Sequence, residues 1–74
     1  MKRLEKILHI IDEETQKAIA GNTLDTVTLD TLYISQLAGV DRTNASKLMN
    51  RLWREGSLIK IQSHPVVYLS RGIL

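Results

Sequence analysis

The sequence contains no cysteine, one proline and four glycines, and 43% of its residues are hydrophobic. Without cysteine the chain can form neither a disulfide framework nor a thiolate metal site, and a reducing compartment fits this composition. The two histidines, His9 and His64, lie far apart and have no third ligand at metal-binding spacing. We therefore expect a folded chain that binds no metal and needs no cofactor.

Long apolar runs are also missing from the sequence. Charged side chains interrupt the apolar residues of the N-terminal stretch MKRLEKILHIIDEETQK, which therefore lacks the continuous core of a signal peptide. No other segment approaches the length that is needed to span a bilayer. These absences predict a cytoplasmic protein without a membrane partner.

The chain is short, at 74 residues. A domain of this size buries only a marginal core and leaves no room for a deep substrate pocket. The sequence also lacks a glycine-rich phosphate loop and any set of nucleophile, base and orienting group. We expect a single domain over residues 1–74 that is not an enzyme.

Charge is distributed unevenly along the chain. Residues 1–41 carry four basic and seven acidic side chains, a net charge of −3. Residues 42–74 carry six basic side chains and one acidic side chain, Glu55, a net charge of +5. A strongly basic C-terminal half predicts a surface that faces a polyanion.

Two helices are predicted in the first half of the chain. Apolar residues at three-and-four spacing indicate a helix from about residue 2 to about residue 20, which a Gly-Asn pair ends. A short second helix follows an N-cap at Thr28 or Asp30 and stops at Gly39. The residues whose spacing predicts this helix are Leu32, Ser35, Leu37 and Ala38. The β-branched residues 26–28 before it are a candidate for a very short strand.

The second half of the sequence predicts a third helix and a hairpin. Asp41 is the expected N-cap of this helix, and Gly56 stands where it should end. The apolar stripe that we expect in the core consists of Ala45, Leu48, Met49, Leu52 and Trp53. The β-prone runs 57–62 and 66–69 flank Ser63-His64-Pro65 and are predicted to pair as a hairpin.

The junction between the second and third helices is typical of a helix-turn-helix unit. Ser35 and Ala38 are small enough for two helices to cross closely, and Gly39 permits an unusual backbone angle in the turn. The apolar residues expected to seal the two helices together are Ile34, Val40, Ala45 and Leu48. The predicted fold is mainly α with a small β wing: a winged helix-turn-helix, with a three-helix core plus a C-terminal β-hairpin.

In a helix-turn-helix, the second helix of the unit is displayed so that its outer face enters the major groove of DNA. Here that face would present Arg42, Thr43, Asn44, Ser46, Lys47, Asn50, Arg51 and Arg54. The candidates for base contacts, near the start of the helix, are Arg42, Thr43, Asn44 and Lys47. We expect Arg51 and Arg54 to hold phosphates. The N-terminus of the preceding helix, with Thr28 and Thr31, is a further candidate phosphate site.

Other residues leave two interpretations open. His64, at the predicted hairpin tip, is either an ordinary turn residue or a groove or phosphate contact. Trp53, Tyr33 and Tyr68 are expected to pack in the core or at its boundary, and Lys60 is expected on the exposed face of the hairpin. The whole chain also has an alternative function, as a winged-helix module that binds protein and not DNA, because the fold serves both purposes.

The stretch LAGVDRTNASKLMNRLWREGSLIKI, followed by HPVVYL, resembles the N-terminal winged helix-turn-helix of LevR-like bacterial transcriptional activators, which regulate sugar phosphotransferase operons. The resemblance covers about residues 28–69 and is most specific in the runs DRTNAS and EGSLIK. Ser63 and His64 stand where the family tends to have glycine and arginine. The missing guanidinium weakens the expected contact between the wing and DNA.

The resemblance implies that the chain is the N-terminal DNA-binding piece of a longer regulator. The other parts would hydrolyse ATP, engage an alternative sigma factor and accept phosphate on histidine, and we expect none of them within residues 1–74. The implied activity is sequence-specific binding of double-stranded DNA. A homodimer or higher oligomer, formed through the parent protein, would occupy two half-sites. The operator, the sugar, and the choice between activation and repression stay open.

Overall fold

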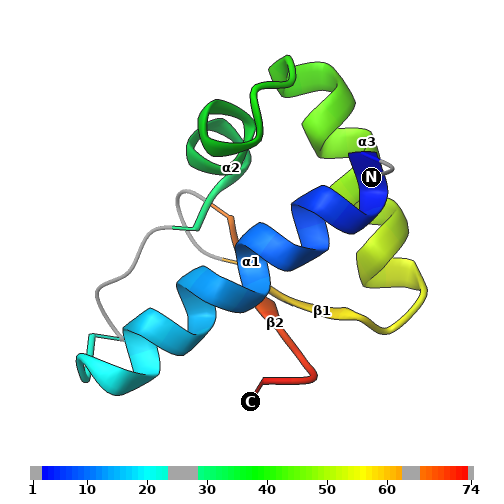
Figure 1. Ribbon diagram of the computed structural model, residues 1–74. Coiled ribbons are helices and arrows are strands. Elements are labelled where there is room, and N and C mark those ends of the chain that lie inside the picture. Colours follow the sequence, from blue (N-terminus) through cyan, green and yellow to red (C-terminus); the bar gives the residue numbers. More distant parts are fainter. Residues whose placement is uncertain (1–2, 24–28, 63–65, 74) are drawn as a thin grey trace.

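The computed structural model describes residues 3–23, 29–62 and 66–73. The elements are α1 (Arg3–Ala20), α2 (Thr31–Ala38), α3 (Arg42–Arg54), β1 (Leu58–Ile61) and β2 (Val67–Ser70), as Figure 1 shows. The predicted fold class, three helices followed by an antiparallel hairpin, is confirmed. The strand expected at residues 26–28 and the turn at residues 63–65 lie outside the described residues. No helix among the described residues is both long and apolar enough to cross a membrane.

Helix α1 runs across the molecule and packs against α2, α3 and β2 (Figure 1). Its buried residues are Ile7, Ile11, Thr15 and Ala18, which follow the three-and-four spacing seen in the sequence. The helix ends as predicted at the Gly-Asn pair, because Asn22 has φ 55° and the Thr23 backbone N–H donates to the Ala18 carbonyl at 2.8 Å.

Local capping residues set the bounds of α2. Of the two candidates for its N-cap, Asp30 takes the role: its carboxylate accepts a hydrogen bond from the Tyr33 backbone N–H at 2.8 Å. Gly39 ends the helix with φ 69°, as predicted. Thr28, the other candidate, lies outside the described residues.

The buried face of α2 consists of the residues predicted at the crossing with α3, and the two leucines of the helix lie outside it. Ile34, Ser35 and Ala38 are buried, whereas Leu32 and Leu37 are each 47% exposed. Only one narrow side of this two-turn helix meets α1 and α3, and the two leucines flank that side. The helical spacing of Leu32 and Leu37 in the sequence therefore indicates the helix but not which of its residues are buried.

Helix α3 begins and ends where the sequence indicates. The Asp41 carboxylate accepts a hydrogen bond from the Asn44 backbone N–H, and Gly56 follows the helix with φ 84°. Of the predicted stripe, Ala45, Met49 and Leu52 are buried and Leu48 is partly buried. Trp53 is 42% exposed, so its placement in the core was wrong. It lies eight positions after Ala45, which turns it about 80° around the helix, away from the buried side.

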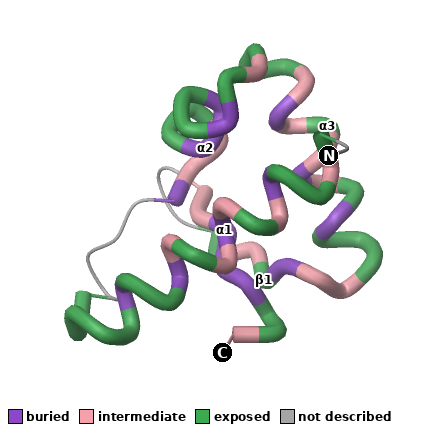
Figure 2. Tube along the Cα trace, viewed as in Figure 1, coloured by how far each residue is buried: buried purple, intermediate pink, exposed green. Residues whose placement is uncertain are grey.

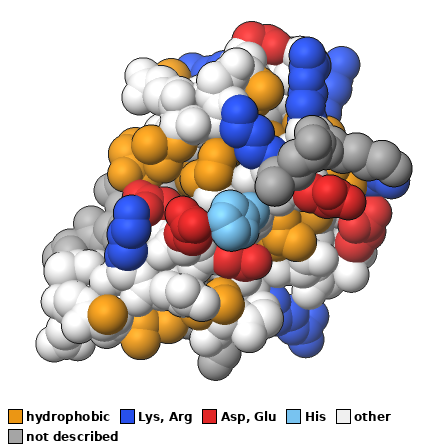
Figure 3. All heavy atoms as spheres, in the orientation of Figure 1, with side chains coloured by type: hydrophobic (Ala, Val, Ile, Leu, Met, Phe, Trp, Pro, Cys, Tyr) orange, Lys and Arg blue, Asp and Glu red, His pale blue; other side chains and the backbone are white. Residues whose placement is uncertain are grey.

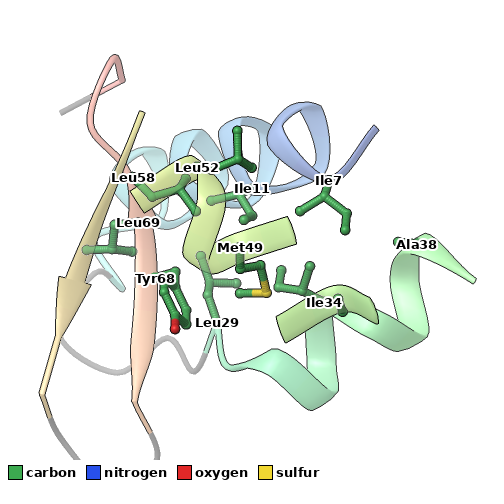
Figure 4. Packing of buried hydrophobic residues seen from close by; sticks show 11 residues of the cluster. Ile7, Ile11, Leu29, Ile34, Ala38, Met49, Leu52, Leu58, Tyr68 and Leu69 are labelled. Carbon is green, nitrogen blue, oxygen red and sulfur yellow. The ribbon is translucent and has the colours of Figure 1, made fainter. Parts of the chain in front are cut away.

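Strands β1 and β2 pair in antiparallel register, with Lys60 opposite Tyr68. The Tyr68 backbone N–H donates to the Leu29 carbonyl at 3.0 Å, so β2 lies between β1 and the segment that leads into α2. Side chains from every element meet in one core, which Figure 4 shows in detail and Figure 2 shows along the whole chain. Its largest fully buried hydrophobic members are Ile7, Ile11, Leu29, Ile34 and Met49.

A buried polar link fastens the end of the hairpin to α1. The Ser70 backbone N–H donates to the Thr15 hydroxyl oxygen at 3.1 Å, and that hydroxyl donates to the Ile11 carbonyl at 2.7 Å. The Ser70 hydroxyl donates in turn to the Asp12 carboxylate. Thr15 and Ser70 are almost fully buried, so these bonds replace water that neither group can reach.

Candidate nucleic-acid interface

The turn between α2 and α3 fixes how α3 is displayed. The Val40 backbone N–H donates to the Ser35 carbonyl at 3.2 Å, and the Ser35 hydroxyl bonds back to the Leu32 carbonyl at 2.7 Å. Ser35 and Ala38 are buried, which confirms that small residues occupy the crossing. The inner side of α3 packs on α1 and α2, and Thr43, Lys47 and Arg54 on its opposite side are exposed.

The outer side of α3 carries several of the predicted DNA contacts. Thr43, Lys47, Asn50 and Arg54 follow one another at intervals of four, three and four residues, and therefore share one side, away from the buried residues. Thr43, Lys47 and Arg54 are exposed there, and Arg42 is exposed at the start of the helix. The structure thus brings Thr43, Lys47 and Arg54 onto one accessible surface, while Arg42 is accessible at the start of the helix, about 100° around it from Thr43.

Asn44 has a structural bond that the sequence did not indicate. Its side-chain Nδ2 donates to Asp41 Oδ1, while its backbone N–H donates to Asp41 Oδ2 at 3.4 Å. The side chain therefore belongs to the N-terminal cap of α3. A bidentate contact with adenine would have to take Nδ2 away from Asp41, since such a contact uses both the donor and the acceptor of the amide.

Two predicted residues, Ser46 and Asn50, are half-buried on the flank of α3 that faces the hairpin. The Tyr68 hydroxyl donates to Asn50 Oδ1 at 3.3 Å. Ser46 lies one turn before Asn50 on the same flank. These residues are next to the outer surface of α3 and are less accessible than Lys47 or Arg54.

The cations of α3 differ in whether a carboxylate holds them. Arg51 Nε lies 3.2 Å from Glu55 Oε1, in an exposed pair one turn apart. Arg42, Lys47 and Arg54 have no ion-pair partner among the described residues. The only acidic side chain in residues 42–74 is thus occupied by Arg51, and the other cations of the helix keep their charge for an external anion.

The predicted phosphate site at the N-terminus of α2 contains a carboxylate. Asp30 accepts from the Tyr33 backbone N–H there, and Thr31 beside it is half-buried. A phosphate at this position would meet a like charge. Thr28 and His64, the two remaining predicted contacts, lie outside the described residues.

Lys60 of β1 packs against α3, a contact that the sequence did not predict. Lys60 Nζ lies 4.7 Å from the ring centroid of Trp53 and 5.8 Å from that of Tyr68. Lys60 is half-buried against α3, so its placement on the exposed face of the hairpin was wrong. The alternation of side chains along β1 could have predicted this position, because Lys60 lies on the same face of the strand as the buried Leu58.

Acidic side chains lie on α1, as Figure 3 shows in the middle of that helix. Glu14 accepts a hydrogen bond from the Tyr33 hydroxyl at 2.8 Å and lies 3.1 Å from Lys17 Nζ. The Tyr33 bond, with a smaller contribution from Lys17, lowers the pKa of Glu14, and the same carboxylate raises the pKa of both Tyr33 and Lys17. His9 Nε2 lies 2.8 Å from Glu13 Oε1. The Tyr33–Glu14 bond links α2 to α1, and Lys17 neutralises part of the acidic charge of α1.

Comparison of the chain with protein families, with curated proteins and with solved structures found no match. Within the described residues no group of three His, Cys, Asp or Glu side chains is placed to hold a metal ion.

Proposed function

We propose that this chain binds double-stranded DNA through α3, as the operator-recognition domain of a bacterial transcriptional regulator. The observation that carries this proposal is the arrangement of Arg42, Lys47 and Arg54. Among the described residues these cations have no carboxylate partner, and they are exposed on a helix whose inner side packs on α1 and α2. That combination suits a helix that enters the major groove.

The proposed DNA contacts fall into two groups along α3: base contacts in its first half and phosphate contacts near its C-terminal end. Arg42, Thr43 and Lys47 occupy its first half, where side chains reach base edges, and the two cations can donate to guanine O6 and N7. Arg54, near the C-terminal end, would bind a phosphate of the DNA backbone. Arg51 would make a second contact of this kind once its pair with Glu55 opens. An isolated domain with so few contacts should bind with modest affinity. A homodimer or higher oligomer of the parent protein would then supply the second half-site.

The regulatory setting follows from the resemblance to LevR-like activators. Under this proposal the domain recognises operators of sugar phosphotransferase operons, works in the cytoplasm and belongs to a longer chain. What supports it is the run DRTNAS, which in the structure forms the N-cap and first turn of α3. These are the residues closest to where bases would be contacted.

The test is a binding-site selection followed by titration of the selected duplex at fixed low salt. Replacing Arg42 or Lys47 by alanine should each cost about 1–3 kcal/mol of binding free energy and relax the sequence preference at one position. Lys17→Ala on α1 removes an equal charge away from α3 and serves as the control. Unchanged affinity in both α3 variants would refute the assigned contacts.

A second candidate function is the binding of a protein partner. The observation in its favour is the exposed apolar side of α2, where Leu32, Leu37 and Tyr33 are 39–47% accessible. DNA binding should weaken steeply with salt, whereas an apolar protein contact should not. Failure to retain the chain on a DNA column would favour this candidate.

A further inference from the structure

Helix α3 and the hairpin meet at a cluster of four side chains, Asn50, Trp53, Lys60 and Tyr68, which we call the wing joint. Lys60 of β1 extends between the rings of Trp53 and Tyr68, with its ammonium nitrogen 4.7 Å and 5.8 Å from their centroids. The Tyr68 hydroxyl donates to Asn50 Oδ1 at 3.3 Å. These contacts link α3 to both strands, so the joint holds Lys60 in a defined place.

The contacts within the joint leave its donors largely unused. The rings attract the ammonium of Lys60 through their faces, which accept none of its N–H groups in an ordinary hydrogen bond. Lys60 has no carboxylate partner among the described residues. Asn50 uses Oδ1 toward Tyr68, which leaves its Nδ2 group as a donor. A half-buried cation and an amide donor thus lack an anion.

The joint also adjoins the surface proposed to meet DNA. Asn50 lies on the flank of α3 next to Lys47, and Trp53, one turn further along that flank, is 42% exposed. Glu55, the nearest acidic residue in the sequence, is held by Arg51. Within residues 42–74, which contain both α3 and the hairpin, the only side-chain carboxylate is therefore already paired.

We infer that the wing joint binds a phosphate of the DNA backbone, with Lys60 as its cation and Trp53 as the platform that positions that cation. This inference rests on the proposed function and adds a contact in which the hairpin takes part. It assigns the wing a role through β1, independently of its tip. Trp53 and Tyr68 act by holding Lys60, and no base stacking is required of them.

The test uses a short duplex of mixed sequence, because phosphate contacts do not depend on base identity. For each phosphate contact, raising monovalent salt from about 50 to about 200 mM multiplies the dissociation constant by roughly 3.5. Lys60→Gln should therefore weaken binding at low salt and reduce this salt-dependent ratio by roughly 3.5-fold. Lys60→Arg should keep both values close to those of the unchanged protein. Lys17→Gln, on α1, removes the same charge outside the joint and should leave the ratio unchanged.

A double-mutant comparison tests the part played by Trp53. If the indole acts by placing Lys60, Trp53→Leu should weaken binding in the unchanged protein and have little further effect after Lys60→Gln. Independent, additive losses would overturn the assignment of Trp53 as the positioning residue. Far-UV circular dichroism and thermal midpoints show whether each variant is folded.

The unmodified protein offers an independent measurement. Trp53 is the only tryptophan in the sequence, so its emission reports on the joint alone. Saturable change in that emission on titration with the duplex, reversed by salt, is the expected result. If Lys47→Gln weakens binding but Lys60→Gln matches Lys17→Gln, the inference is overturned and the proposed function stands. If the unmodified protein does not bind the duplex at all, the proposed function fails, and the inference fails with it.

Discussion

Replacing Thr15 by valine tests whether the link between α1 and the hairpin stabilises the fold. Valine has nearly the shape of threonine, so it leaves no large cavity, and the two residues have similar helix propensity. What is lost is the hydroxyl that accepts from the Ser70 backbone N–H at 3.1 Å and donates to the Ile11 carbonyl at 2.7 Å. The Ile11 carbonyl loses one donor but stays within α1, where the helix backbone supplies its usual donor. The Ser70 N–H, in contrast, becomes a buried donor without an acceptor. A buried donor without an acceptor lowers the free energy of unfolding by about 1–3 kcal/mol.

That loss is large beside the total stability expected for 74 residues, about 4–11 kcal/mol at typical values per residue. In a domain of this size a change of about 2 kcal/mol lowers the thermal midpoint by roughly 8–16 °C. Urea titration, followed by circular dichroism, measures the same difference as a lower midpoint with an unchanged slope. Thr15→Ser changes the same position but retains the hydroxyl, so it should keep the bond to the Ser70 N–H. A valine variant as stable as the unchanged protein would refute the reasoning, because the Ser70 N–H would then have another partner.

Three further predictions concern α2, the turn and α3. Asp41→Ala removes the N-cap of α3 and should lower stability by about 1 kcal/mol in urea titration, while Asp41→Asn should retain most of it. Gly39→Ala places a side chain at φ 69° with no atom within 4 Å of its Cβ, so the expected loss of roughly 1 kcal/mol is backbone strain alone. Tyr33→Phe removes the hydrogen bond to Glu14 and should lower the free energy of unfolding at neutral pH. The loss should be only about 0.5–1 kcal/mol, because that bond is exposed to water. Since that bond lowers the pKa of Glu14, its contribution is present above the carboxyl's ordinary pKa and is lost as the pH falls through the lowered pKa. The two proteins should therefore converge in acid, and a constant difference across that range would contradict the assignment.

The features that the sequence predicted well depend on a few neighbouring residues. Asp41 caps α3 because its carboxylate reaches the backbone three positions ahead, and Gly39 ends α2 because glycine tolerates a left-handed backbone. Both effects involve only residues within about one helical turn of each other in the sequence. The elements they delimit, and the hairpin that follows, could therefore be placed without knowledge of the tertiary structure.

The features that the sequence predicted poorly depend on where other elements lie. Apolar spacing alone gave Trp53 a place in the core, yet the hairpin passes beside it and leaves the indole partly open to water. Lys60 was expected in solvent, but the pairing of β1 with β2 and the approach of α3 bring it onto two rings. Which side of a helix or strand is covered is decided by packing, and a pattern of residue types only narrows the choice.

The net charge of +2 understates the field that a DNA molecule would meet at α3. Helix α1, which carries several carboxylates, packs on the inner side of α3, so the outer cations lie beyond the width of a helix, about 10–12 Å. At physiological ionic strength the Debye length is about 8 Å, shorter than this separation and much shorter than the molecule's extents of 29 × 25 × 22 Å. Of the carboxylates on α1, Glu14 is further balanced by Lys17, whose Nζ lies 3.1 Å away. The local charge of α3 and β1, and not the net charge, therefore determines whether this domain attracts a polyanion.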